Sequence, residues 1–122
     1  MHIRKKQIGK IGGRKVMLVD GNEVRNRIDI DFVSGGNPAR YGYVPDDEIW
    51  IEKSLDRRER APTILHEVTE ERLMRTKGLS YGEAHDRASA TEARLRRRMG
   101  ARGSSDPVRT VRRFRRGGRR RR

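Results

Sequence analysis

Residues 62–85 read PTILHEVTEERLMRTKGLSYGEAH, and this stretch decides the fold because it carries the end signals of two consecutive helices. Pro62 is of a type favoured in the first turn of a helix, and Gly78 is of a type favoured just after a helix ends. The residues between them mix apolar and charged side chains, as an amphipathic helix does. A first helix is therefore predicted over about 62–77.

A second helix is predicted to start immediately after that glycine. Ser80 and Glu83 form the S-x-x-E pattern of a capping box, in which each side chain binds the backbone N–H of the other residue. The helix is predicted to run to about residue 99, because Gly100 follows. Two helices joined by so short a turn are expected to pack side by side in antiparallel directions.

Residues 14–52 are predicted to form a small antiparallel β-sheet in front of the two helices. Residues 16–19 are apolar, and DGNE at 20–23 has the composition of a turn. Apolar and acidic residues alternate over 28–32, which is typical of a half-buried strand, and EIWIE at 48–52 reads as another strand. The predicted fold class is α+β.

Charge is concentrated at the two ends of the chain. The formal net charge is +14, but residues 1–15 carry +6 and residues 100–122 carry +9, so the middle of the chain is close to neutral. We therefore predict a basic flexible arm over 1–13, one domain over 14–100 and a disordered, Arg-rich tail over 101–122.

Composition also excludes several classes of protein. There is no cysteine, so disulfides and thiolate metal ligands are ruled out. No apolar run approaches the ~20 residues that span a membrane, and the N-terminus lacks the apolar stretch of a signal peptide. The expected location is the cytoplasm, or a host cytoplasm or virion if the protein is encoded by a phage.

Two polar residues fall on the packing face of the second predicted helix. At ~100° per residue, His85 and Glu92 lie in the same arc as Ala84, Ala88 and Leu95, while the other charges point elsewhere. Burial of an unpaired carboxylate costs several kcal/mol or forces its protonation. We therefore expect polar partners on the neighbouring helix.

The first predicted helix offers such partners. His66 and Glu70 are four residues apart and share one side of it, so antiparallel packing would bring them opposite His85 and Glu92. Imidazoles and carboxylates are ligands that Zn²⁺ accepts, and Mn²⁺ or Fe²⁺ accept them as well. Glu67 lies ~100° further round the helix, so it cannot easily bind the same metal but could hold a metal-bound water. In helical metalloproteases with an H-E-x-x-H motif, the Glu of the motif is the general base.

The segments LHEVTEERLM (65–74), GLSYGEAH (78–85) and ASATE (88–92) resemble zincin-type metallopeptidases, in particular small proteins of this type from phages and prophages. The resemblance covers roughly residues 16–95. It implies a short β-region ahead of a metal-binding helix, and a zinc-dependent peptidase or other hydrolase activity.

The resemblance also implies roles for individual residues. His66 corresponds to the first metal ligand, Glu67 to the general base and His85 to the third ligand. Glu70 stands where the common H-E-x-x-H pattern has its second His. Glu92 either competes with Glu70 as the carboxylate ligand or orients His85 from behind.

Structural roles are open at the same positions. His66 and Glu70 also fit an ordinary i,i+4 pair on a wet helix face, and His85 also fits a buried, hydrogen-bonded histidine. Three aromatic residues either line a substrate cleft or simply pack against the sheet, and packing is the commoner role; they are Tyr41, Tyr43 and Trp50.

The C-terminal segment predicts a second activity. Ten arginines and the single aromatic residue Phe114 lie within residues 100–122, a composition suited to nucleic-acid phosphates or to an acidic protein surface. Binding of DNA or RNA would be non-specific and sensitive to salt. The residues expected to make these contacts are Arg109, Arg112, Arg113, Arg115, Arg116, Arg119, Arg120, Arg121 and Arg122.

The sequence leads to two hypotheses about the function, which belong to different classes of protein. One is a zinc-dependent hydrolase that binds a peptide as an extended strand beside the sheet edge, tethered by its tail to nucleic acid. The other is a non-enzymatic nucleic-acid-binding accessory protein of a virion or nucleoprotein assembly, in which the polar cluster is purely structural.

Overall fold

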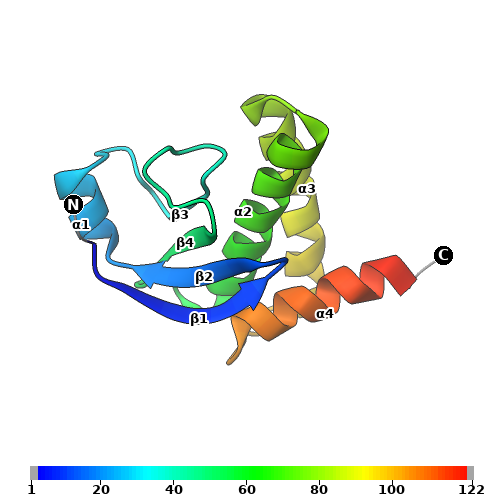
Figure 1. The fold of residues 1–122 in the computed structure, drawn as a ribbon. Helices are drawn as coiled ribbons and strands as arrows, with labels where there is room; N and C mark the ends of the chain where they lie inside the picture. The colour runs from blue at the N-terminus through cyan, green and yellow to red at the C-terminus, as the bar shows by residue number, and fades with distance from the viewer. Residues whose placement is uncertain (1–2, 121–122) are drawn as a thin grey trace.

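The structure is a computed structural model that describes residues 3–120, with side chains described for residues 3–117. A small sheet with one short helix precedes two long packed helices, and a further helix closes the chain (Figure 1). The predicted α+β class is therefore confirmed. The elements are β1 (Lys5–Ile11), β2 (Arg14–Val19), α1 (Gly21–Arg27), β3 (Gly35–Gly36), β4 (Glu48–Glu52), α2 (Arg57–Lys77), α3 (Tyr81–Met99) and α4 (Pro107–Arg120).

The sheet is mixed rather than purely antiparallel. Its strand order is β1-β2-β4-β3, with β1 antiparallel to β2, β2 parallel to β4, and β3 antiparallel to β4. The parallel pair arises because the chain leaves β2 through α1 and a long loop before it returns as β4, which is a crossover connection. β3 is left at the edge of the sheet.

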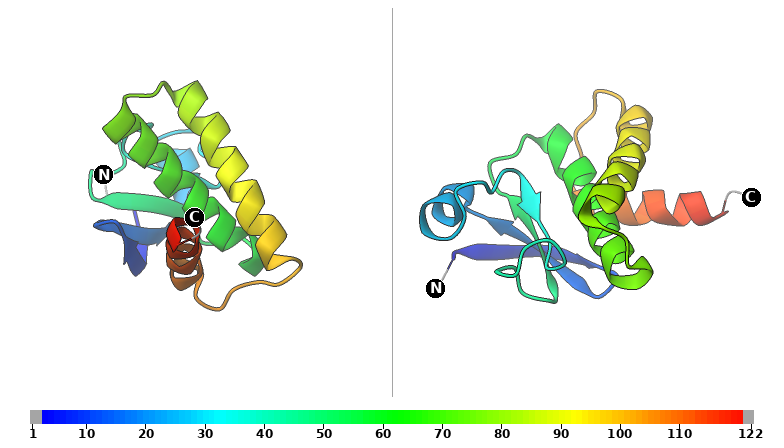
Figure 2. Two further views of the ribbon diagram at one scale, coloured as in Figure 1. Left: turned by 90° about the vertical axis from the view of Figure 1, so that its right-hand side faces the viewer. Right: turned by 90° about the horizontal axis from the view of Figure 1, so that it is seen from above.

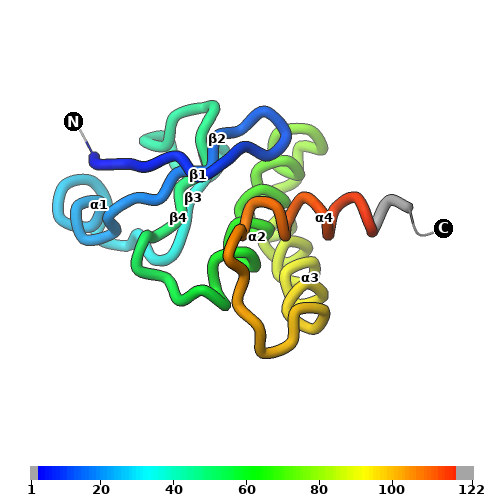
Figure 3. The backbone as a smooth tube through the Cα atoms, turned by 90° about the horizontal axis from the view of Figure 1, so that it is seen from below, coloured from blue at the N-terminus to red at the C-terminus, as the bar shows by residue number. Residues whose placement is uncertain are grey.

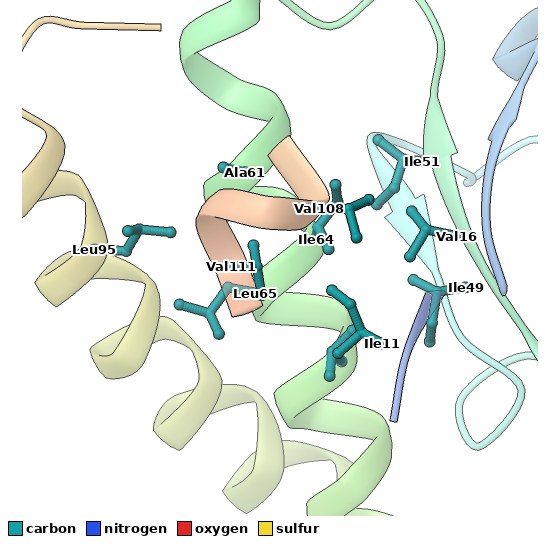
Figure 4. Close-up of a cluster of buried hydrophobic side chains, with 11 residues drawn as sticks. Ile11, Val16, Ile49, Ile51, Ala61, Ile64, Leu65, Leu95, Val108 and Val111 are labelled. Carbon is teal, nitrogen blue, oxygen red and sulfur yellow. The ribbon is translucent and has the colours of Figure 1, made fainter. Parts of the chain in front are cut away.

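Both faces of the sheet are covered, which explains why every residue of β4 is buried. Ile49 and Ile51 face α2, α3 and α4, as Figure 4 shows for the larger of two apolar clusters. Trp50 points to the other face, where it packs with Val24 of α1 and Phe32. The predicted strand at 48–52 is therefore confirmed, and its two faces contribute to two separate apolar clusters.

The two long helices match their predicted signals closely. Gly78 ends α2 in the left-handed conformation, with φ of 65°, and Ser80 and Glu83 form both hydrogen bonds of the capping box of α3. The start of α2 differs from the prediction, because Asp56 caps the helix through the backbone N–H of Arg58 and places Pro62 inside it.

The turn and strand predicted at 20–23 and 28–32 were wrong. Asp20 accepts hydrogen bonds from the backbone N–H groups of residues 22 and 23, and thereby caps α1 instead of closing a hairpin. Residues 28–32 form no strand: Phe32 is buried in the smaller cluster, but Ile30 is 74% exposed.

The two basic ends are also more ordered than predicted. The arm includes β1, which forms a hairpin with β2. The tail includes α4, whose Val108 and Val111 are buried among residues of α2 (Figure 4). Gly9 of β1 makes this docking possible, because a Cβ there would lie 2.8 Å from the Val108 side chain. α4 crosses α2 next to the β1–β2 hairpin (Figure 3). Arg121 and Arg122 lie outside the described residues.

Within residues 3–120, no helix combines the length and the apolar character needed to cross a lipid bilayer.

Candidate metal centre

The α2–α3 hairpin brings the predicted polar residues together. Ala84, Ala88 and Leu95 of α3 are buried against its neighbours, as the helical wheel predicts. The two alanines carry only a methyl group each, so α3 lies close to α2 along this part of the interface. His85 and Glu92 are thereby carried to the side chains of His66 and Glu70 on α2.

His66, Glu70 and His85 form a group that could hold a metal ion, because one ligand atom from each lies within 4.8 Å of the others. Oε2 of Glu70 is the centre of the group. It lies 3.1 Å from Nε2 of His66 and 3.1 Å from Nδ1 of His85. The two imidazole rings meet edge to face, with their centroids 4.8 Å apart.

Glu92 takes a supporting position beside this group. Its Oε1 accepts a hydrogen bond from Nδ1 of His66 at 2.9 Å, and its Oε2 accepts from Arg96 at 2.9 Å. Arg96 in turn donates to both carboxylate oxygens of Glu59. Glu92 therefore orients His66, and not His85 as one of the sequence hypotheses had it. Because Nδ1 is occupied, Nε2 of His66 is the nitrogen directed at Glu70 and His85.

Glu67 is buried next to the group formed by His66, Glu70 and His85, but it is not part of that group. Its Oε1 accepts a hydrogen bond from Nδ2 of Asn37 at 2.9 Å, and the same amide donates to Oε1 of Glu70 at 3.0 Å. Asn37 is fully buried in the loop that follows β3. A single side-chain amide thus holds two carboxylates at a fixed separation.

Gly35 of β3 allows the approach of Glu67 to the sheet. A Cβ at residue 35 would lie 3.1 Å from Cγ of Glu67 and 3.0 Å from the backbone carbonyl oxygen of Trp50. Only glycine leaves this space free, so the edge strand and the carboxyl group of Glu67 lie side by side.

The pKa values of the histidine and the paired carboxylates favour their charged forms. Burial acts to lower the pKa of His66, but hydrogen bonds to Glu70 and Glu92 raise it to about 10. Burial acts to raise the pKa of Glu70, but hydrogen bonds from both imidazoles hold it below its usual range. The pKa of Glu92 is lowered in the same way, by His66 and Arg96.

The pKa of Glu67 is shifted in the direction that favours its neutral form. Burial, together with the nearby charge of Glu70, raises the pKa of Glu67 to about 7. Two carboxylates one helical turn apart thus have pKa values pushed in opposite directions. Pairs of carboxylates whose pKa values are pushed apart in this way are common at functional sites.

The cluster lies at the wall of an open cleft with a volume of about 350 Å³, between β3 on one side and α2 and α3 on the other. Tyr41 and Tyr81 line it along with the polar residues, and Val33, which is 73% exposed, adds an apolar patch. Tyr43 and Trp50 pack in the smaller apolar cluster instead, so the packing interpretation holds for those two aromatics.

Three residues of this site escaped the sequence analysis. Asn37 lies in a loop whose only local signals were glycine and proline, and its fixed position depends on contacts with a distant helix. Glu59 and Arg96 looked like ordinary surface charges. Arg96 follows Glu92 by one turn of the same helix, and this spacing could have suggested their pairing. Glu59 lies on α2, far from both in the sequence.

Comparisons of the chain with protein-family models, with curated proteins and with solved structures find no match.

Proposed function

We propose that this protein is a metal-dependent hydrolase that cleaves peptide bonds, with Zn²⁺ as its metal. The observation that carries the proposal is the position of Oε2 of Glu70, 3.1 Å from one nitrogen of each histidine, with Glu67 buried alongside. The residues of this cluster are also the ones that carry the resemblance of residues 65–92 to zincin-type metallopeptidases.

The donor set fits a zinc ion. Ligand atoms that bind a tetrahedral zinc at ~2.0–2.1 Å lie ~3.3–3.4 Å from one another, close to the separations seen between Glu70 and the two histidines. Two nitrogens and one carboxylate oxygen form the set found in catalytic zinc sites, which keep a fourth position open. His66, Glu70 and His85 would hold the ion, and Glu92 would fix the orientation of His66.

Glu67 is the proposed general base. A bound zinc ion polarises a carbonyl group and makes a water molecule more acidic. The carboxylate of Glu67 would accept the proton of the attacking water and pass it to the leaving amine. In the metal-free protein, burial and the charge of Glu70 raise the pKa of Glu67 to about 7, so this carboxyl group takes up a proton more readily than the other carboxylates of the cluster. Asn37 would hold this carboxylate in place.

An extended peptide is the substrate that the cleft suits best. β3 is one of the two edge strands of the sheet, and its Gly35 lines the cleft beside Glu67. A peptide that pairs with this edge would pass over the histidines. Val33 and Tyr41 would offer apolar and aromatic contacts to its side chains.

The experiment is to load purified protein with zinc and follow cleavage of a mixed peptide library by mass spectrometry. We expect defined cleavage products from the wild type. Glu67→Gln should still bind zinc but lower the turnover rate by roughly 10²–10⁴-fold, because only the proton acceptor is removed. His85→Ala should lose both zinc and cleavage. An inactive zinc-loaded wild type, or an active Glu67→Gln variant, would overturn the proposal.

A further inference from the structure

The outer face of α4 carries a stripe of arginines. Four of them, at spacings of i, i+3, i+4 and i+7, are exposed on one side of the helix: Arg109, Arg112, Arg113 and Arg116. The opposite side of the helix packs on the domain through Val108, Val111 and Phe114. The packing therefore fixes which way the arginine stripe points.

Most of this charge is not neutralised by the protein. In the part of the chain whose side chains are described, Arg109, Arg113 and Arg116 form no ion pair, and α4 contains no acidic residue. Arg112 donates two hydrogen bonds, of 3.0 and 2.7 Å, to the backbone carbonyl of Lys10. This contact brings the exposed Lys10 of β1 next to the stripe and extends the basic surface.

A hollow lies at the base of the stripe, where α3 ends and α4 begins. It has a volume of about 450 Å³, and its polar lining includes Arg98, Arg102, Ser104 and Thr110. Neither arginine forms an ion pair with any described residue. Arg98 is held over the Phe114 ring, 5.2 Å from its centroid. The hydroxyl of Thr110 donates to the backbone carbonyl of Asp106 and is also hydrogen-bonded to the hydroxyl of Ser104. The donors that remain in the hollow are the two guanidinium groups, which suit a phosphate group.

We infer that the outer face of α4, with Lys10 and the hollow at its base, is a binding surface for the phosphate backbone of nucleic acid. Four arginines spread over eight residues of helix cover about 10 Å, a length along which duplex DNA carries several phosphates. Binding would be non-specific, because guanidinium groups on a helix surface contact phosphates without reading the bases.

Nucleic acid fits this surface better than an anionic membrane does. Helices that bind a membrane surface bury an apolar face in the lipid, whereas the apolar side chains of α4 are already packed in the protein core. The charged residues of the helix are all arginine, whose planar guanidinium forms paired hydrogen bonds with phosphate.

The surface is separate from the candidate metal centre. β3, which borders the metal cleft, and α4 lie on opposite sides of α2 (Figure 2, right). The inference therefore goes beyond the proposed hydrolase activity, and the two can succeed or fail independently.

The test is fluorescence anisotropy of the full chain with a labelled, mixed-sequence DNA duplex of about 25 base pairs, between roughly 50 and 300 mM salt. The test variant replaces Arg109, Arg113 and Arg116 with Gln and leaves Arg112 in its contact with Lys10. The matched control replaces Arg72, Lys77 and Arg87 with Gln. All three are exposed on the halves of α2 and α3 next to the turn that joins these helices, and that turn lies at the end of the hairpin away from α4 (Figure 1). The control therefore removes the same charge from another part of the surface.

We expect the test variant to lose at least about tenfold in affinity and to reduce the slope of log affinity against log salt by about 2 to 3 units, with little change in the control. Circular dichroism would check that both variants fold. Equal losses in the two variants, or no binding by the wild type at low salt, would overturn the inference. So would stripe-dependent binding to phosphatidylserine vesicles without stripe-dependent binding to DNA.

Discussion

Nδ1 of His66 donates a hydrogen bond to Oε1 of Glu92 across the α2–α3 interface, at 2.9 Å. This contact fixes which nitrogen of His66 faces Glu70, and so it determines whether the three proposed ligands can converge on one ion. Glu92 is in turn held by Arg96, which also binds Glu59. A chain of hydrogen bonds from Glu59 through Arg96 to Glu92 thus holds His66 in its orientation.

Removal of this support should weaken metal binding without abolishing it. We expect Glu92→Ala to lower the affinity for Zn²⁺ by roughly 10–100-fold, because His66 loses the partner that orients its ring. Asp86→Ala is the matched control, since residue 86 is an exposed carboxylate on the same helix. Competition with a fluorescent chelator measures both affinities. Equal affinities for the two variants would contradict the role given to Glu92.

Asn37 should stabilise the fold through its two hydrogen bonds to buried carboxylates. We expect Asn37→Ala to lower the free energy of unfolding by about 1–3 kcal/mol, because Glu67 and Glu70 each lose a donor that water cannot easily replace. The control is Asn26→Ala on the exposed side of α1, which should stay within about 0.5 kcal/mol of wild type. Urea denaturation gives both values.

The raised pKa of Glu67 predicts how stability changes with pH in the presence of a chelator. The folded protein holds this proton up to about pH 7, whereas the unfolded chain releases it near 4.5. The folded state therefore binds more protons between these values, and this group makes the protein less stable as pH rises through that window. His66 acts in the same direction at higher pH, because the stability from its raised pKa is lost between about 6.5 and 10.

Glu67→Gln isolates the contribution of that carboxyl group. Relative to wild type, the variant should become more stable as the pH rises from about 4.5 to 7, by up to about 3 kcal/mol. Urea unfolding of both proteins at matched pH values measures this difference. A difference that does not change with pH would show that Glu67 titrates normally.

The docking of α4 gives a prediction about the C-terminal segment. Val111 is fully buried between α4 and the domain, so Val111→Ala should lower the free energy of unfolding by about 1–3 kcal/mol. Arg113→Ala on the outer side of α4 should have little effect. If the segment were a free tail, both variants would unfold at the wild-type urea concentration.

The sequence predicted α2, α3 and the placing of His85 and Glu92 on the side of α3 that faces α2, because those features depend on local rules. A capping box, a terminal glycine and a period of 3.6 residues act within a few residues of one another. The same reasoning placed Glu70 opposite His85, where the structure has it.

Two of the features that the sequence analysis missed, the docking of α4 and the position of Asn37, depend on contacts between distant residues. The charge of the tail suggested disorder, but Val108 and Val111 recur at helical spacing and find an apolar site beside Gly9, about a hundred positions earlier. Asp20 fits a helix cap as well as a turn, because the same side-chain hydrogen bonds serve both structures. Asn37 had no local signal, since its partners lie 30 and 33 residues away.

The most direct test of the account is the zinc content of the protein after zinc addition and extensive dialysis, measured for wild type and His85→Ala by elemental analysis. His85 is a suitable residue because its side chain is 45% exposed, so its removal should leave the fold intact. High salt during purification would remove bound nucleic acid and any metal that it carries. We predict about one zinc ion per wild-type chain and almost none in the variant. A folded wild type without zinc, or equal zinc in both proteins, would contradict the account.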